Sequence, residues 1–428
     1  MRTGRVFFVL LLFWVIFPLA AEEVYHPGEY WGAHPTVTWE LLSAEPMLTS
    51  FSDVEGRAIF QVFTFPPGLY ADSEAVAQAM IGGLDADAEV APFVYTTAET
   101  LGALYRGEGI PISETVPGAD LASVPVGGQT EALFGDLSWS TGNLDVRGYG
   151  VFLSGGQEAN SYGVLAFAAA DFYDQYHDFL LSNLDSFHPW LVAEADYTRA
   201  PGPVSQFFSD PGILAEIHGE VSTGRASFAQ TFDYLYDRAD ATQVVIDREA
   251  RILSQYQQAP ADLQNDAWRR FYQIIYRDAF ADLAGKAIDL YSSLAPSAPA
   301  ADQWPAPILT AIQAYDYRRA GTLADLEAPQ TAVMAEAGDC DTLVLTYLGV
   351  LEHLGIDGII MVSPRHAHSL AGVGSGVQGA TPGANARFTF DDHSWLVAEL
   401  TQQVDLGLIA ASMADPADWF GFDLEFRP

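Results

Sequence analysis

Apolar and polar positions in the first half of the chain predict strands followed by a covering helix. Arg57–Phe65 is rich in β-branched and aromatic residues and ends at two prolines, which stop a strand. Leu137–Ala168 has the pattern of successive strands separated by turn residues. Apolar residues recur at helical spacing in Ala169–Leu184 and in Ser73–Leu84. This order of elements predicts an α+β sandwich over residues 22–190.

The pattern changes to helices after about Pro211. Asn265–Leu294 has the clearest helical periodicity, the Ala- and Pro-rich stretch Ala295–Pro307 is typical of a loop, and Ile308–Tyr317 resembles one more short helix. We therefore interpret residues 191–300 as a helical segment that leads into a core formed by residues 301–428.

The first 21 residues have the layout of a secretory signal peptide. Arg2 and Arg5 precede the uncharged apolar run Val6–Ala20, and small residues precede the acidic Glu22. The run is shorter than the roughly 18 residues of a membrane span. We expect an exported protein, periplasmic or secreted. Leu19 at the −3 position leaves an uncleaved N-terminal anchor as the alternative.

Charge and cysteine content narrow the class of function. The chain has 19 Lys+Arg against 56 Asp+Glu, a net charge of −37, which excludes a nucleic-acid partner and attraction to an anionic membrane surface. Its one cysteine, Cys340, excludes an internal disulfide and CxxC-type zinc or redox sites. His366 and His368 form an HxH pair without an evident third ligand. We expect no metal and no cofactor.

Cys340 lies in the most informative segment of the sequence. It follows Asp339, a good helix N-cap, and begins an apolar helical stripe that ends at Gly355, a good C-cap. A cysteine in the first helical turn meets unpaired backbone N–H groups and the positive end of the helix dipole, and both favour the thiolate. We expect Asp339 to cap the helix and Asp341 to lie at the surface.

A histidine and an acid follow on successive predicted strands. Gly358–Val362 is a buried strand, the segment from His366 through His368 begins the next one, and Trp395–Thr401 carries Glu399. In such an order the imidazole can take the thiol proton and return it to a leaving group, while the carboxylate orients the ring. Asp391, Asp392 and His393 are most simply a polar hairpin turn.

These residues resemble the transglutaminase-like (papain-type) cysteine superfamily in its bacterial branches. The resemblance rests on the Gly-Asp-Cys-Asp box at 338–341, the HSxxGV-like segment at 368–373 and the E-x-T segment at 399–401, and it covers roughly residues 265–428. It implies a papain-like α+β core with Cys340 as nucleophile, His368 rather than His366 as base, and Glu399 in the place of the usual aspartate.

The expected function follows from that resemblance. It implies thiol-dependent acyl chemistry on peptide amides, by hydrolysis or transfer, with a peptide or protein substrate. The alternative is an inactive domain of the same fold that binds peptides or envelope proteins. Tyr315 either lines the site or belongs to the core, and the backbone N–H of Cys340 is the better donor to an oxyanion. The N-terminal sandwich also resembles that of the extrinsic oxygen-evolving photosystem subunits.

Overall fold

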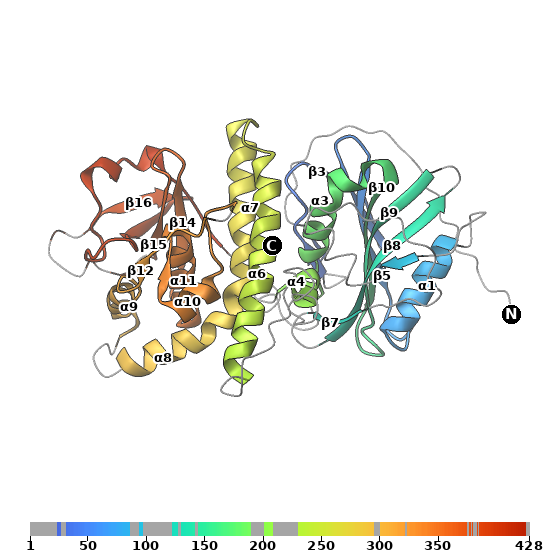
Figure 1. Cartoon of the computed structure of the whole chain (residues 1–428), viewed down its shortest axis with the longest axis horizontal. Helices are drawn as coiled ribbons and strands as arrows, with labels where there is room; N and C mark the ends of the chain where they lie inside the picture. Colours follow the sequence, from blue (N-terminus) through green and yellow to red (C-terminus); the bar gives the residue numbers. More distant parts are fainter. Residues whose placement is uncertain are drawn as a thin grey trace. The chain divides into compact units, whose positions relative to one another are not determined.

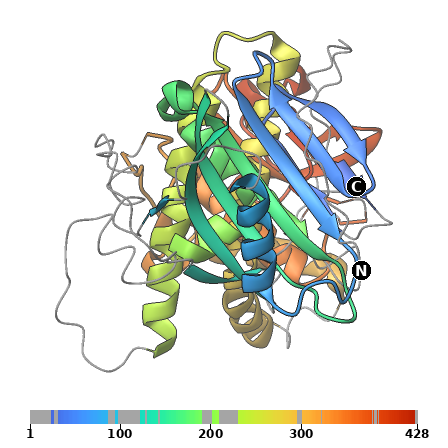
Figure 2. The ribbon, with the colours of Figure 1, turned by 90° about the vertical axis from the view of Figure 1, so that its right-hand side faces the viewer.

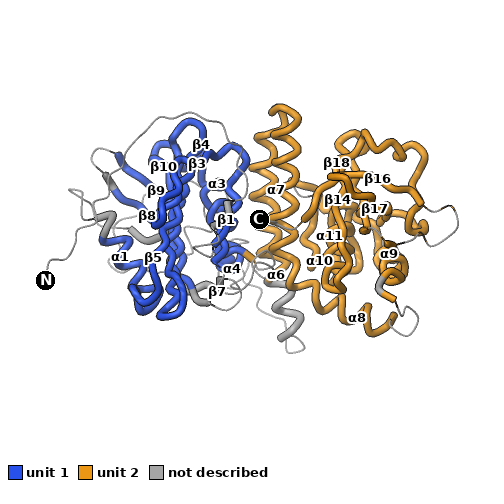
Figure 3. The backbone as a smooth tube through the Cα atoms, turned by 180° about the vertical axis from the view of Figure 1, so that it is seen from behind, with its two compact units in different colours: residues 1–197, 202–221, 428 blue, residues 198–201, 222–427 orange. Residues whose placement is uncertain are grey.

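The chain forms two compact units, each with helices and sheets, in the computed structural model. One unit comprises residues 1–197, 202–221 and 428, and the other residues 198–201 and 222–427 (Figure 3). Each is described by itself below. The described residues are 24–26, 31–85, 94–96, 122–126, 130–141, 144–189, 201–208, 230–294, 300–321, 323–374, 376–377, 379, 383 and 385–424. The expected signal peptide lies outside them.

The first unit is built on an eight-stranded antiparallel sheet. Its spatial order is β3-β4-β5-β10-β9-β8-β6, and β7 also pairs with β8. The long central strands match the stretches whose pattern predicts strands. The bounds are Trp39–Glu45 (β3), Leu48–Asp53 (β4), Ala58–Phe65 (β5), Val94–Thr96 (β6), Ala122–Val126 (β7), Thr130–Thr141 (β8), Leu144–Leu153 (β9) and Ser161–Ala169 (β10).

Helices α1 (Ser73–Asp85) and α3 (Tyr173–Asp185) pack on opposite faces of this sheet, as Figure 1 shows. In Figure 2, α1 lies in front of the long strands. Because side chains alternate between the faces of a strand, Phe152 packs in the α1 core while Tyr149 faces α3 and accepts a hydrogen bond from Tyr173 at 2.5 Å. A 3₁₀ turn, η1 (Ala170–Phe172), joins β10 to α3.

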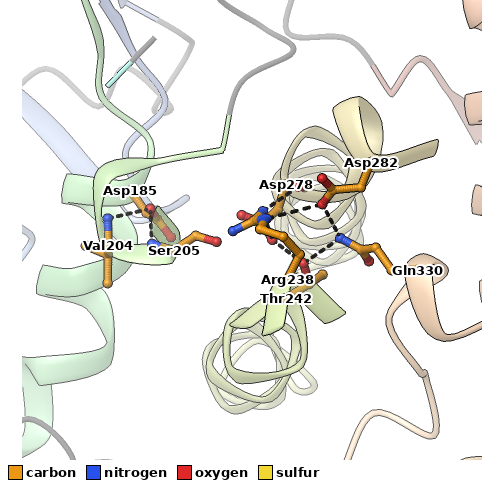
Figure 4. Close-up of polar contacts among 8 residues, drawn as sticks. All are labelled: Asp185, Val204, Ser205, Arg238, Thr242, Asp278, Asp282 and Gln330. Atoms are coloured by element: carbon orange, nitrogen blue, oxygen red, sulfur yellow. Dashed lines mark hydrogen bonds and ion pairs between the residues drawn. The ribbon is translucent and has the colours of Figure 1, made fainter. Parts of the chain in front are cut away.

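A small sheet and a short helix complete the described part of this unit. The sheet order is β1-β2-β11, with bounds Val24–His26, Trp31–Ala33 and His188–Pro189. The carboxylate of Asp185 accepts the backbone N–H groups of Val204 and Ser205, both at 3.1 Å, at the start of α4 (Pro203–Phe208) (Figure 4). It thereby satisfies N–H groups that have no partner within the helix.

The second unit has a five-stranded antiparallel sheet in the order β16-β17-β15-β14-β18. Alternate residues face two separate cores: Ile360 packs with helix α11, whereas Ile359 packs with Trp419 on the other face. The bounds are Gly358–Ser363 (β14), His368–Val373 (β15), Arg387–Phe390 (β16), His393–Ala398 (β17) and Phe420–Phe422 (β18).

Helices of this unit enclose α11 (Cys340–His353), which packs against β14 and β15. The other helices are α6 (Gln230–Ser254), α7 (Ala261–Phe280), α8 (Ala284–Leu294), α9 (Pro305–Ile312) and α10 (Pro329–Ala335). Short 3₁₀ turns lie at Ala281–Leu283 (η3), Ala301–Gln303 (η4), Ala411–Met413 (η5) and Pro416–Asp418 (η6). Two short strands, Asp316–Tyr317 (β12) and Ala337–Gly338 (β13), pair with each other.

A buried polar network ties these helices together. Arg238 of α6 donates to Asp282 at 3.2 Å and to the backbone carbonyl of Asp278 at 3.0 Å, and Thr242 donates to the Asp278 carboxylate at 2.5 Å. Gln330 of α10 donates to Thr242 and to Asp282, both at 2.9 Å (Figure 4). Since α10 runs into β13 and then α11, this network fixes the segment that leads to Cys340.

The structure confirms an α+β fold and corrects some predicted bounds. The helix expected over Ile308–Tyr317 ends at Ile312, and Asp316 and Tyr317 form a strand instead, because their backbone pairs with residues just before Cys340. The helix expected over Asn265–Leu294 is interrupted by the turn η3. Within the described ranges, no helix has both the length and the apolar character needed to cross a membrane.

Candidate active site

Cys340 occupies the first position of α11, as the capping pattern predicts. The carboxylate of Asp339 accepts the backbone N–H of Thr342 at 2.8 Å, which defines the start of the helix. The Cys340 side chain therefore lies among the first N–H groups of the helix, which lack partners within it. Cys340 is only 8% exposed, so protein atoms cover most of its surface.

His368 and Glu399 meet because their strands are neighbours. β15 pairs with β17 in a register that matches Ala371 with Ala398, and extending it by one residue places Glu399 opposite Leu370. His368 is two residues from Leu370 on the same face, so it is a diagonal neighbour of Glu399. The His368 Nε2 to Glu399 Oε2 distance is 2.8 Å.

The Glu399 carboxylate is held on both of its oxygens. Oε1 accepts the backbone N–H of Thr401 at 2.8 Å and its hydroxyl at 2.7 Å, while Oε2 faces His368. Burial alone would raise the pKa of Glu399, but the hydrogen bonds from His368 and Thr401 keep it below its ordinary value. Glu399 is therefore a fixed negative charge that orients the imidazole.

His368 links this carboxylate to Cys340. Burial alone would lower the pKa of His368, but its hydrogen bonds to Cys340 and Glu399, together with their charges, raise that pKa to about 10. Because Nε2 faces Glu399, Nδ1 is the ring nitrogen that remains for the sulfur. The structure thus brings together all three residues that the sequence singles out, in the order Cys340, His368, Glu399.

Two aspartates flank the cysteine, and one of them departs from expectation. Asp339 is the expected cap, and burial raises its pKa to about 7. Asp341, expected at the surface, is half-buried because its carboxylate accepts the Tyr272 hydroxyl of α7 at 3.0 Å. Burial raises the pKa of Asp341, and the neighbouring hydroxyls of Ser369 and Tyr272 partly offset that rise.

His366 belongs to a different pair. It lies in the turn before β15, not on the strand, and its Nε2 is 3.1 Å from Asp418 Oδ2. Asp418 also accepts Arg365 at 2.5 Å. The strand expected to begin at His366 therefore begins at His368 instead. The Trp419 ring lies near both, with ring centroids 5.7 Å from His366 and 6.3 Å from His368.

Tyr317, not Tyr315, lies on the strand that pairs with the segment leading to Cys340: its partner across the ladder is Gly338, two residues before the cysteine. Burial raises the pKa of Tyr317, and the charges of Cys340 and Asp339 raise it further. Tyr315 instead packs against the helical core, with the Lys286 ammonium 5.3 Å from its ring centroid. Sequence reasoning missed Tyr317 because a two-residue strand leaves almost no periodic signal.

The site combines a thiol, a base and an acid. Among the described residues, no group of three or more His, Cys, Asp or Glu side chains is arranged to hold a metal ion. The arrangement of Cys340, His368 and Glu399 can carry out nucleophilic chemistry in which the imidazole takes and returns the thiol proton.

Comparisons with known proteins return no family, and the likenesses of structure are distant. No family model and no curated protein matches the chain. It is similar to cyanobacterial PsbP (CyanoP) from Synechocystis sp. PCC 6803, at 10% identity over 42% of this chain and 99% of that chain, with a TM-score of 0.28. It is also similar to a crystal structure from Bacteroides thetaiotaomicron VPI-5482, at 6% identity over 61% and 78%, with a TM-score of 0.24. Such TM-scores define neither a family nor a function for this chain.

Proposed function

We propose that this protein is an exported, transglutaminase-like acyl-transfer enzyme that acts on peptide amides. The observation that carries the proposal is the position of His368 between Cys340 and Glu399, with its pKa raised by both. In this arrangement Cys340 is the nucleophile, His368 the base and then the acid, and Glu399 the residue that orients the ring. The expected location is the periplasm or the medium.

The proposed reaction uses only these groups and the peptide. The Cys340 sulfur attacks the amide carbonyl carbon while His368 holds the thiol proton. Backbone N–H groups at the start of α11, including that of Cys340, donate to the oxyanion. His368 then transfers its proton to the leaving amine as the C–N bond breaks, which leaves a thioester on Cys340. Water completes a hydrolysis, and a second amine completes a transfer.

Alkylation of the single cysteine tests this proposal directly. Iodoacetamide should label Cys340 rapidly at pH 6, where an ordinary thiol with a pKa of about 8.5 reacts slowly. His368→Ala should abolish that reactivity at pH 6 and leave labelling only at alkaline pH. His366→Ala is the matched control, and because His366 pairs with Asp418 it should leave the profile unchanged.

The opposite result favours the alternative function. If Cys340 is labelled slowly at pH 6 and His368→Ala changes nothing, the pair is not activated and the catalytic assignment is wrong. A non-catalytic domain that binds peptides or envelope proteins would then be the better description. Loss of reactivity in His366→Ala but not in His368→Ala would transfer the role of base to His366.

A further inference from the structure

A short strand with one open edge lies next to Cys340. β12 pairs in parallel with β13, and Gly338 of β13 is two residues before the cysteine. In the part of the chain that the structure describes, β12 and β13 form a sheet of their own, so no third strand covers β12. Both residues of β12 are exposed, and Tyr317 is 53% exposed. This edge is therefore accessible to another chain segment.

The backbone of β12 uses only one of its two sides. The N–H of Asp316 donates to the carbonyl of Glu336 at 2.8 Å, and the N–H of Arg318 donates to the carbonyl of Gly338 at 2.9 Å. Successive residues of a strand direct their N–H and C=O groups to opposite edges, so those of Tyr317 point to the open side. An antiparallel strand placed opposite Tyr317 would exchange two hydrogen bonds with it.

The arginine side chains next to this edge are already paired with carboxylates, so the edge would recognise a bound segment mainly through its main chain. Arg318 forms an ion pair with Glu327 at 2.6 Å, and Arg319 forms one with Asp325, so both cations are already neutralised. Gly338, the ladder partner of Tyr317, is two residues before Cys340. A segment bound along the open edge would therefore lie one strand away from the segment that leads to the sulfur, and it would be held through its backbone.

We propose that the open edge of β12 is the substrate-binding edge, on which an extended polypeptide segment adds as an antiparallel strand through the N–H and C=O of Tyr317. Strand addition to a free sheet edge takes its affinity from main-chain hydrogen bonds. The ligand class is therefore an unfolded or looped segment with an unmodified backbone amide opposite Tyr317, largely independent of its side chains. This inference rests on the proposed function.

Peptide alkylating agents test the edge separately from the chemistry. The probes are a Val-Ala-Val segment with a bromoacetyl group at its N-terminus and the same segment with a chloromethyl ketone at its C-terminus, each with and without N-methylation of its internal amides. The rate of Cys340 modification is measured by mass spectrometry. At least one probe should react about fivefold or more faster than its N-methylated form, since each net hydrogen bond contributes roughly 1 kcal/mol.

Two variants at one position separate backbone from side chain. Tyr317→Pro removes the outward N–H but leaves the β13 hydrogen bonds of Asp316 and Arg318, and it should abolish the preference for the unmethylated probe. Tyr317→Ala keeps the N–H and should retain that preference. Iodoacetamide needs no strand, so its rate with each variant serves as that variant's own reference, and the preference is read as the ratio of the unmethylated to the N-methylated probe rate within each variant.

The outcomes are distinct. If N-methylation changes the reaction rate of neither peptide probe in the wild type, the edge proposal is overturned. This conclusion holds whatever the variants do, and it holds even if iodoacetamide reactivity at pH 6 supports the Cys340–His368 pair. Equal discrimination in Tyr317→Pro and the wild type overturns it as well. If the proline variant loses iodoacetamide reactivity through misfolding, the N-methylation comparison in the wild type decides alone. Slow iodoacetamide labelling of the wild type counts against the proposed function instead.

Discussion

At the scale of single residues, the proton on His368 depends on a carboxylate 2.8 Å away. We expect Glu399→Gln to lower the pKa of His368 from about 10 toward the ordinary value of about 6.5, because the charge that favours the imidazolium is removed. The pH above which His368 loses its proton should fall with it. NMR titration of the His368 ring in the folded protein measures this shift.

Asp418→Asn provides the matched control, because it removes the carboxylate that pairs with His366. It should leave the pKa of His368 unchanged, and an equal shift in both variants would mean that His368 responds to the overall charge of its surroundings and not to Glu399.

The raised pKa of His368 also implies a pH dependence of stability. Its contribution to the free energy of unfolding is fully present below about pH 6.5 and is lost as the pH rises through about 10.

Asp339 has the opposite effect on stability. One of its oxygens caps α11, but among the described residues Oδ2 is buried without a hydrogen-bond partner. A carboxyl whose pKa is raised from 3.8 to about 7 by folding makes the protein less stable as the pH rises from about 4 to about 7. Asp339→Asn keeps a good cap and removes the buried charge.

We therefore expect Asp339→Asn to raise the free energy of unfolding by on the order of a few kcal/mol at pH 8 and by much less at pH 4.5. Urea unfolding at the two pH values, monitored with the tryptophan fluorescence of both proteins, measures the difference. An identical effect at both pH values would show that the cap, and not the buried charge, determines the result. Loss of stability at pH 8 would contradict the sign of the shift.

At the scale of elements, the end of α11 depends on a glycine. Gly355 follows the helix with a φ of +72°, and a Cβ built there would meet no atom within 4 Å. Gly355→Ala should therefore destabilise the second unit by about 1 kcal/mol through backbone strain alone. Gly285→Ala in α8 has the same open space without a positive φ and should be neutral or slightly stabilising. Equal urea midpoints for the two variants would contradict the strain argument.

The cysteine helix and its strands were predictable because local signals coincide there. Asp339, the apolar stripe and Gly355 mark both ends of one helix. The strand predicted over Trp395–Thr401 corresponds to β17, which ends at Ala398, one residue before Glu399. Contacts between distant segments were not predictable from such signals. His366 could not be separated from His368 by pattern alone, because its partner Asp418 is 52 residues away.

The same limit applies to Asp341 and Tyr317. The Tyr272 hydroxyl that draws Asp341 inward is 69 residues away in the sequence, and an acidic residue after a cap is otherwise typical of a surface. Tyr317 belongs to a two-residue strand that forms by pairing with Ala337 and Gly338. Periodicity reports which face of an element is buried, but it does not report what that face contacts.

At the scale of the whole molecule, negative charges greatly outnumber positive ones. The chain carries 56 acidic against 19 basic residues, and four of the arginines are almost completely buried in α6 and α7: Arg238, Arg248, Arg270 and Arg277. Few cations therefore remain to intersperse with the carboxylates at the surface. Repulsion among like surface charges destabilises a compact state, and dissolved ions screen that repulsion.

We accordingly expect the thermal unfolding midpoint to rise by several degrees between about 10 and 300 mM ionic strength, because the screening length falls from about 30 Å at 10 mM to below 10 Å. Scans in NaCl and in Na₂SO₄ at matched ionic strength distinguish screening from the exclusion of sulfate from the protein surface. Screening gives coincident curves over this range, whereas exclusion makes sulfate the more stabilising salt. A midpoint that stays constant or falls in NaCl would mean that the surface carboxylates are far enough apart, at a net charge of −37, for their repulsion to have no effect on stability.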